Sequence, residues 1–72
     1  MKTQALTNYL RVERARAGVS QAELAARIGT YEQKILRFEK GRLQPTSDEM
    51  ELIADALGTS IEAIWPDDEA AA

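Results

Sequence analysis

The sequence predicts an all-α domain built from five short helices, and three observations predict it. Ala, Leu, Glu, Arg and Gln are good helix formers, and they dominate the composition. β-branched residues do not alternate with polar ones over a useful length, so we expect no strand. Glycines and a proline divide the chain into segments of helical length. A chain of 72 residues holds one such domain and not two.

Gly18 separates the first two predicted helices, which cover about residues 3–17 and 21–28. Ser20 is a good N-cap for the second helix, and Glu23 three residues later completes a capping box. Each helix has apolar residues at helical spacing. The residues expected to face the core are Leu6, Leu10, Ala17, Leu24, Ala25 and Ile28.

The remaining three helices are predicted over about 31–40, 48–57 and 61–65. Ser47 and Ser60 are the expected N-caps of the last two, because serine oxygens accept from free N–H groups at helix starts. The expected stops are Gly41, Gly58 and Pro66, and the expected inward residues are Ile35, Phe38, Met50, Ile53, Ala54, Leu57, Ile61, Ile64 and Trp65. Helices this short are unstable alone, so tertiary packing must hold them.

Charge is distributed unevenly along the chain. The whole chain carries nine Lys and Arg against twelve Asp and Glu, a net charge of −3. Residues 1–46 contain all nine bases and four acids, whereas residues 47–72 contain eight acids and no base. The first part therefore carries +5 and could face a polyanion, with the acidic part turned away. Scattered charge that only maintains solubility is the alternative interpretation.

Cysteine and histidine are both absent from the sequence. The chain therefore has no disulfide, no thiolate or imidazole for a structural zinc, and no histidine to act as a catalytic base. It also lacks a phosphate-binding loop, and its acids are spread as solvated faces. We expect a protein that is not an enzyme and that needs no metal or cofactor.

No apolar run approaches the roughly 18 residues that a membrane span needs. A signal-peptide core is also missing. These observations predict a cytoplasmic protein without a membrane partner. We expect the helical domain over residues 1–66 and an acidic flexible tail over 67–72, which could alternatively dock a basic partner.

The most informative segment runs from Ser20 to Arg42. Two short helices joined by a sharp turn at Gly29 make a helix-turn-helix motif, placed at about residues 20–40. Gly29 permits the positive φ that such a turn needs. Ala25 lies where the two helices press together, and a larger side chain there would separate them.

Several residue strings in and around this motif carry a family resemblance. They are Leu10-Arg11-x-x-Arg14, Gly18-Val19-Ser20-Gln21-x-x-Leu24-Ala25 and Phe38-Glu39-x-Gly41-Arg42, with Gly29, Ile35, Pro45 and the later Ile53-Ala54-x-Ala56-Leu57-Gly58-x-Ser60. On these residues the chain resembles the phage repressor and Cro type of helix-turn-helix domain, the XRE family. The resemblance covers about residues 6–65 and implies a lambda-repressor-like fold.

The resemblance also implies roles for individual residues. The third helix would lie in the DNA major groove, where Gln33 can pair bidentately with adenine and Arg37 with guanine. The implied base-reading residues are Tyr31, Glu32, Gln33, Leu36 and Arg37. The implied contacts to the DNA backbone are Ser20, Gln21, Lys34, Lys40, Arg42 and Arg11. Arg14 and Glu39 match a structural ion pair of the family.

Three of these positions have more than one interpretation. Glu32 could accept from cytosine N4, could mark weak or altered DNA binding, or could pair with a nearby Lys34 or Arg37. Leu36 could contact a thymine methyl or could be partly covered against the first helix. Tyr31 could reach a phosphate or base, or could pack over the turn.

The resemblance implies a symmetric homodimer on a palindromic operator. The implied interface residues are Leu43, Ile61, Ile64 and Trp65, although Ile64 and Trp65 could instead close the core. We therefore expect a bacterial or phage-encoded, sequence-specific transcriptional regulator, most simply a repressor, that binds double-stranded DNA. A DNA-binding antitoxin with a toxin partner, a restriction–modification controller and a protein-interaction module are the alternatives.

Overall fold

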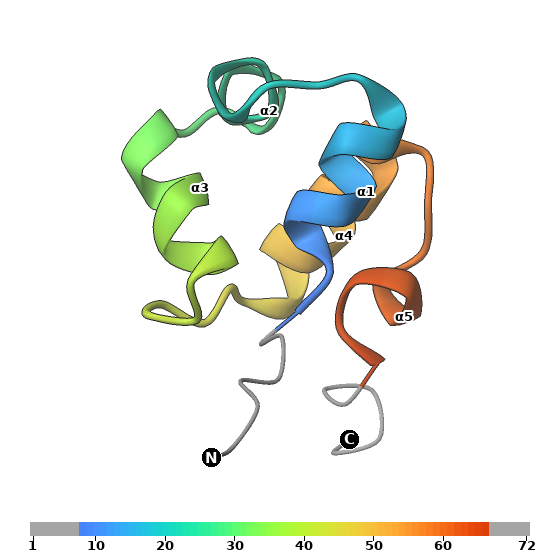
Figure 1. Ribbon diagram of the computed structural model, residues 1–72. Helices are drawn as coiled ribbons and strands as arrows, with labels where there is room; N and C mark the ends of the chain where they lie inside the picture. Colours follow the sequence, from blue (N-terminus) through green and yellow to red (C-terminus); the bar gives the residue numbers. More distant parts are fainter. Residues whose placement is uncertain (1–7, 67–72) are drawn as a thin grey trace, which may run out of the picture.

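The computed structural model describes residues 8–66 and folds them into five helices (Figure 1). They are α1 (Leu10–Ala17), α2 (Gln21–Ile28), α3 (Glu32–Glu39), α4 (Ser47–Leu57) and α5 (Ile61–Ile64). This confirms the predicted all-α class. None of the helices in the described range is long and apolar enough to cross a membrane. Leu6 and the tail predicted over 67–72 lie outside the described residues.

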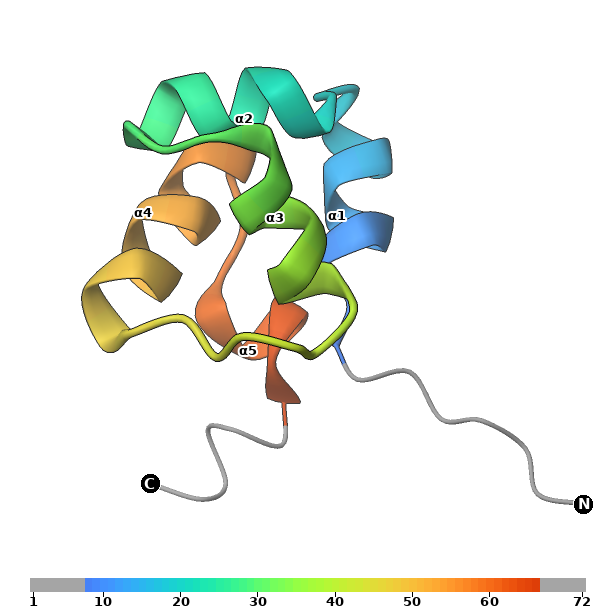
Figure 2. The same cartoon turned by 90° about the vertical axis from the view of Figure 1, so that its left-hand side faces the viewer.

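The helices surround one shared core and leave α3 at the outside. α2 packs against both α3 and α4, while α1 contacts α3, α4 and α5. In Figure 2, α3 faces the viewer, with α2 above it and α1 and α4 on either side. The side of α3 that is turned away from the core is therefore open to solvent.

The core draws on every helix, as the apolar pattern predicts. The buried apolar residues are Leu10, Val19, Leu24, Ala25, Ile35, Phe38, Met50, Ile53, Ala54, Leu57, Ile64 and Trp65. Ala17 is exposed, so its predicted place on the buried stripe of the first helix is wrong. Val19, directly after the helix, enters the core instead, at 5% exposure.

The first helix begins later than its predicted start near residue 3. Asn8 and Tyr9 precede it in non-helical conformation, and the Asn8 Oδ1 atom accepts from the Leu10 N–H at 3.0 Å. The Asn8 amide also donates through Nδ2 to the Phe38 carbonyl at 2.8 Å, and its side chain is buried. Asparagine side chains compete in this way with helical hydrogen bonding, so Asn8 fixes where α1 begins.

The N-cap of α4 is Thr46 and not Ser47. The Thr46 hydroxyl accepts from the Glu49 N–H at 3.1 Å, and the Thr46 N–H donates to the Glu49 carboxylate at 2.8 Å. A capping box needs Glu or Gln three residues after the cap, which Thr46 has and Ser47, followed by Met50, does not. Ser60 caps α5 as predicted, with its hydroxyl accepting from the Ala63 N–H at 3.2 Å.

Candidate nucleic-acid interface

The turn between α2 and α3 has the geometry that the sequence predicts. Gly29 lies in the left-handed region at φ +77° and ends α2. The next N–H, that of Thr30, donates to the Ala25 carbonyl at 2.8 Å. Ala25 is 3% exposed, so its small side chain is enclosed in the packed core. α2 and α3 together form a helix-turn-helix.

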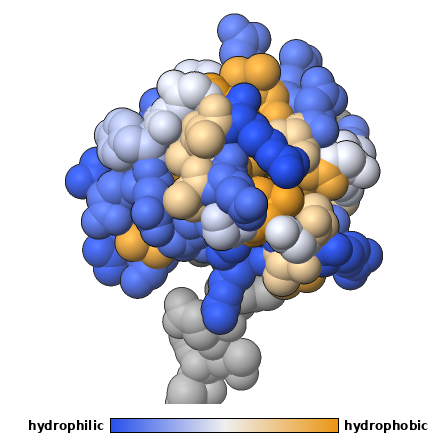
Figure 3. Space-filling view, turned by 90° about the horizontal axis from the view of Figure 1, so that it is seen from above, coloured by the Kyte–Doolittle hydropathy of each residue, from blue (hydrophilic) through white to orange (hydrophobic). Residues whose placement is uncertain are grey.

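The start of α2 carries the predicted capping box. The Ser20 hydroxyl accepts from the Glu23 N–H at 3.0 Å, and the Ser20 N–H donates to the Glu23 carboxylate at 2.8 Å. The bond from the Ser20 N–H stabilises the charged carboxylate and so lowers the pKa of Glu23. The first N–H groups of an α-helix have no partner within the helix and point out of its N-terminal end. Seen from above, over α2, hydrophilic and apolar residues intermingle on the surface (Figure 3).

The outward face of α3 is polar, and its inward face is buried. Glu32, Gln33 and Arg37 are exposed, whereas Ile35 and Phe38 are at most 1% exposed. Tyr31, just before the helix, is 56% exposed and makes no capping hydrogen bond with its side chain. A helix with this division can present three or four polar side chains to a groove while its other face holds the fold.

Glu32 has no ion pair within residues 8–66. The two ion pairs in that range join Arg14 to Glu39 and Lys34 to Glu49. The interpretation in which Glu32 pairs with Lys34 or Arg37 is therefore wrong for this structure. The two interpretations that involve DNA remain open.

Lys34, which the resemblance assigns to the DNA backbone, instead forms an ion pair with Glu49 of α4. Its Nζ lies 2.7 Å from Glu49 Oε2, and both side chains are about one quarter exposed. The same Nζ lies 5.9 Å from the centroid of the Phe38 ring. The carboxylate raises the pKa of Lys34, and the ammonium lowers the pKa of Glu49. Lys34 therefore connects α3 to α4, a contact that spacing along α3 alone does not reveal.

A groove runs between α1 and the outer side of α3. Its volume is about 450 Å³, and its apolar part is formed by Val12 and Leu36. Leu36 is half-buried and Val12 is 42% exposed. The placement favours the interpretation in which Leu36 is partly covered on the side of α1. The other residues that line the groove are Asn8, Arg11, Arg14, Gln21, Glu39 and Lys40.

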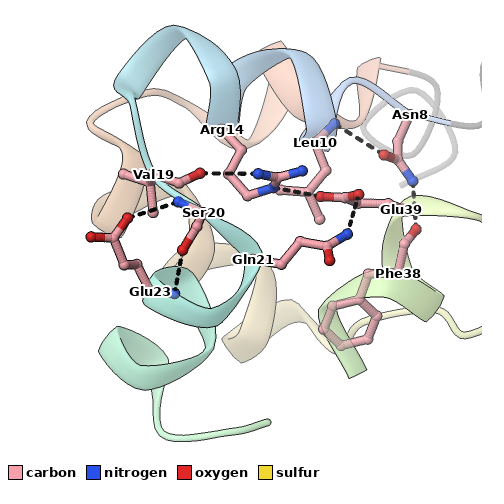
Figure 4. Close-up of polar contacts among 9 residues, drawn as sticks. All are labelled: Asn8, Leu10, Arg14, Val19, Ser20, Gln21, Glu23, Phe38 and Glu39. Carbon is pink, nitrogen blue, oxygen red and sulfur yellow. Dashed lines mark hydrogen bonds and ion pairs between the residues drawn. The ribbon is translucent and has the colours of Figure 1, made fainter. Parts of the chain in front are cut away.

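Three of the residues that line this groove, Arg14, Gln21 and Glu39, form a polar cluster (Figure 4). Arg14 donates through Nε to Glu39 Oε2 at 2.6 Å and through Nη1 to the Val19 carbonyl at 3.0 Å. Gln21 donates through Nε2 to the other carboxylate oxygen, Glu39 Oε1, at 3.0 Å. The ion pair that the resemblance implies is thus present, and Gln21 adds a hydrogen bond to its carboxylate.

Three of the expected backbone contacts remain free for a ligand. Arg11, Lys40 and Arg42 are exposed, and none has an ion-pair partner within the described part of the chain. Arg11 and Lys40 line the groove, from α1 and from the end of α3. Arg42 follows Gly41, and its N–H donates to the Arg37 carbonyl at 2.9 Å. Positive charge therefore flanks the outward face of α3.

The four residues expected at a dimer interface do not all reach the surface. Ile64 is fully buried and Trp65 is 4% exposed, so these two close the core of the single chain and are corrected to core residues. Leu43 is 37% exposed and Ile61 is half-buried. Tyr9, also on the surface, is 41% exposed, and its N–H donates to the Ile64 carbonyl at 2.8 Å.

Comparison with known proteins agrees with this geometry. A family model described as a helix-turn-helix domain matches residues 5–64. The chain is 38% identical over 64 residues to an uncharacterized HTH-type transcriptional regulator, y4dJ, of Sinorhizobium fredii, covering 88% of this chain and 82% of that protein. It is 42% identical over 65 residues to another of Methanothermobacter thermautotrophicus, covering 89% and 94%.

Two solved structures have the same fold. The clp gene regulator ClgR of C. glutamicum gives a TM-score of 0.68 at 33% identity, covering 71% of this chain. The chain spans 65% of that regulator, slightly less than two thirds. The hypothetical transcription factor NHTF from Neisseria gives a TM-score of 0.70 at 27% identity, covering 83% of this chain and 70% of that one.

The fold and the site define a DNA-binding helix-turn-helix domain. The chain belongs to the XRE-like helix-turn-helix family and is a transcriptional regulator that binds DNA.

Proposed function

We propose that the chain is a sequence-specific repressor that binds a palindromic operator as a homodimer, with α3 in the major groove. One observation carries the proposal: α3 exposes Glu32, Gln33 and Arg37 on one face. The cations nearby are Arg11, Lys40 and Arg42, which have no ion-pair partner within residues 8–66. Base-edge contacts supply specificity, while phosphate contacts supply orientation. A dimer seated on an operator excludes polymerase, and its occupancy follows its own concentration in the cytoplasm.

Within this proposal, the base readers are Tyr31, Glu32, Gln33 and Arg37. Gln33 matches adenine and Arg37 matches guanine, because each can form two hydrogen bonds to those base edges. Glu32 accepts from cytosine N4. Replacing Glu32 by Gln then shifts the preferred base at one position, and an equal gain in affinity for every duplex would refute the cytosine contact.

The dimer in this proposal forms through Leu43, Ile61 and Tyr9. Leu43 and Tyr9 are exposed large apolar side chains, and Tyr9 adjoins α5 through its bond to Ile64. Sedimentation measurements of the oligomeric state of the wild type and of the Leu43→Glu variant test this interface. We expect a dimer that Leu43→Glu converts to a folded monomer with weaker operator binding. A wild type that stays monomeric both free and on the operator would contradict it.

Salt-dependent binding tests the whole proposal. Duplexes are enriched from a random pool by the wild-type chain and are then titrated at 50 and 200 mM salt. Neutralising several phosphates makes the binding constant fall steeply with salt. A chain that binds no duplex at either salt concentration would exclude the proposed function.

A second candidate is the DNA-binding antitoxin of a toxin–antitoxin pair. The observation that favours it is the outer face of α4, where the exposed Leu52 lies among Asp48, Glu51 and Asp55, which form no ion pair within residues 8–66. Such a face suits a basic protein partner. Co-purification of a small basic protein from the native host would favour this candidate, and tight operator binding without one would favour the repressor.

A further inference from the structure

The cluster of Arg14, Gln21 and Glu39 contains more than an ion pair. Glu39 uses one carboxylate oxygen for Arg14 and the other for Gln21, at 2.6 and 3.0 Å. The side chains of Glu39 and Arg14 are 6% and 15% exposed, so the pair is held in a largely desolvated position. Arg14 is itself fixed by its bond to the Val19 carbonyl. Glu39 therefore has little freedom to move.

This arrangement determines which way the Gln21 amide points. An ionised carboxylate can only accept hydrogen bonds, so the amide group must direct its nitrogen, not its oxygen, toward Glu39. The nitrogen carries two hydrogens, and Glu39 Oε1 takes one of them. The second N–H is left for another acceptor. Gln21 lines the groove between α1 and α3, and Figure 4 shows its amide directed toward Glu39.

The groove around this amide suits a phosphate oxygen. Arg11 and Lys40 line it, and both lack an ion-pair partner within residues 8–66. The charge of Glu39 would repel a phosphate, but the bound guanidinium of Arg14 offsets it at 2.6 Å. A donor in this position meets a charged acceptor, and such bonds are the stronger ones.

We infer that Glu39 is a positioning residue for DNA binding: held by Arg14, it orients the Gln21 amide so that one N–H donates to a backbone phosphate seated in the groove. The inference rests on the proposed function and assigns the ion pair a second task beyond stability. Gln21 makes the contact, and Glu39 acts only through it. A loss of Glu39 thus weakens the contact even where the fold survives.

The test is a double-mutant cycle on the duplex enriched by the wild-type chain. Arg14→Met with Glu39→Met replaces the ion pair by apolar side chains of similar size, a change that folded proteins often tolerate. We expect Gln21→Ala to weaken binding about tenfold in the wild-type background. In the Met/Met background, Gln21→Ala should have less than a twofold effect. Arg42→Ala, a cation outside the cluster, is the control and should have the same effect in both backgrounds.

A side-chain NMR readout separates orientation from stability. In the free wild type, one Gln21 side-chain amide proton should show the shift of a carboxylate bond, and the other should move when the duplex is added. This measurement needs no variant, so it tests the inference even if the Met/Met protein fails to fold. If adding the duplex changed the chemical shift of neither Gln21 side-chain amide proton, the inference would be overturned.

The outcomes distinguish the inference from the proposed function. A wild type that binds no duplex removes the proposed function and the phosphate contact together. A wild type that binds, with Gln21→Ala equally harmful in both backgrounds, removes only the role of Glu39. Equal salt dependence of wild type and Gln21→Ala is expected, because Gln21 carries no charge to release counterions.

Discussion

Lys34 and Glu49 connect the first half of α3 to the first turn of α4, with 2.7 Å between Nζ and Oε2. Glu49 uses its other oxygen to accept from the Thr46 N–H at 2.8 Å, so one carboxylate both caps α4 and holds α3. Lys34 also lies over the Phe38 ring. The position of α3 is therefore held by a contact on the side away from the groove between α1 and α3.

The ion pair predicts an acid-dependent loss of stability. Glu49→Gln keeps an oxygen for Thr46 but removes the charge, and we expect it to lower Tm by about 2–4 °C at pH 7. Because Lys34 lowers the pKa of Glu49, the stabilisation is present above the ordinary value of 4.5 and is lost as pH falls through the lowered pKa. The Tm difference between wild type and variant should shrink as the pH is lowered from 7 to 3.

The control for this variant is Glu51→Gln, also on α4. Glu51 is exposed and forms no ion pair within residues 8–66, so its variant should melt like the wild type at both pH values. Thermal melts followed by circular dichroism measure all three proteins. A Glu49→Gln difference that persists unchanged at pH 3 would show that the ion pair is not its cause.

Asn8 predicts a strong effect from an isosteric change. Asn8→Asp keeps an oxygen for the Leu10 N–H but places a carboxylate oxygen against the Phe38 carbonyl, where the amide now donates at 2.8 Å. We expect a loss of about 2 kcal/mol in the free energy of unfolding at pH 7, measured in urea. Below the carboxyl pKa the protonated side chain regains a donor, so the loss should shrink. An unchanged free energy at pH 7 would contradict the role given to Asn8.

Two adjacent hydroxyl-bearing residues at the start of α4 should contribute differently to stability. Thr46→Ala removes the hydroxyl that accepts from the Glu49 N–H and should cost about 1 kcal/mol of stability. Ser47→Ala, one residue on and inside the helix, should change stability by less than about 0.5 kcal/mol. Urea denaturation of the two variants decides between the caps. Equal losses, or a larger loss at Ser47, would be inconsistent with the capping box.

Lys34 and Arg42 should differ in their effect on DNA binding. Arg42 is exposed and unpaired within the described part of the chain, so Arg42→Ala should weaken binding to all duplexes and reduce the salt slope by about 1. Lys34→Ala should leave the slope unchanged, because its charge is offset by Glu49. Filter binding across a salt series measures both. A slope that falls equally in the two variants would restore Lys34 to the DNA backbone contacts.

Most of the fold follows from local signals in the sequence. Gly29 and the Ser20–Glu23 box determine the turn and the start of α2, because each acts within four residues. The same local rule assigns the cap of α4 to Thr46, one residue before the predicted Ser47, because Glu49 follows Thr46 by three residues. Thr46 and Glu49 contain the missing signal.

The contacts that sequence reasoning missed are those between distant segments. Asn8 reaches Phe38 across 30 residues of sequence, and Lys34 reaches Glu49 on another helix. Periodicity shows that a lysine is on a polar face but does not show which carboxylate it meets. Only the resemblance assigns Gln21 to the DNA backbone, and its bond to Glu39 forms between α2 and α3 in the folded chain.

Whether the outward face of α3 reads DNA sequence is tested by repeating the duplex enrichment with Arg37→Ala beside the wild type. We expect the wild type to enrich a palindromic site. The variant should lose preference for one guanine in each half-site, by about 1–3 kcal/mol, and should keep its other base preferences. An unchanged sequence preference in the variant would contradict the claim.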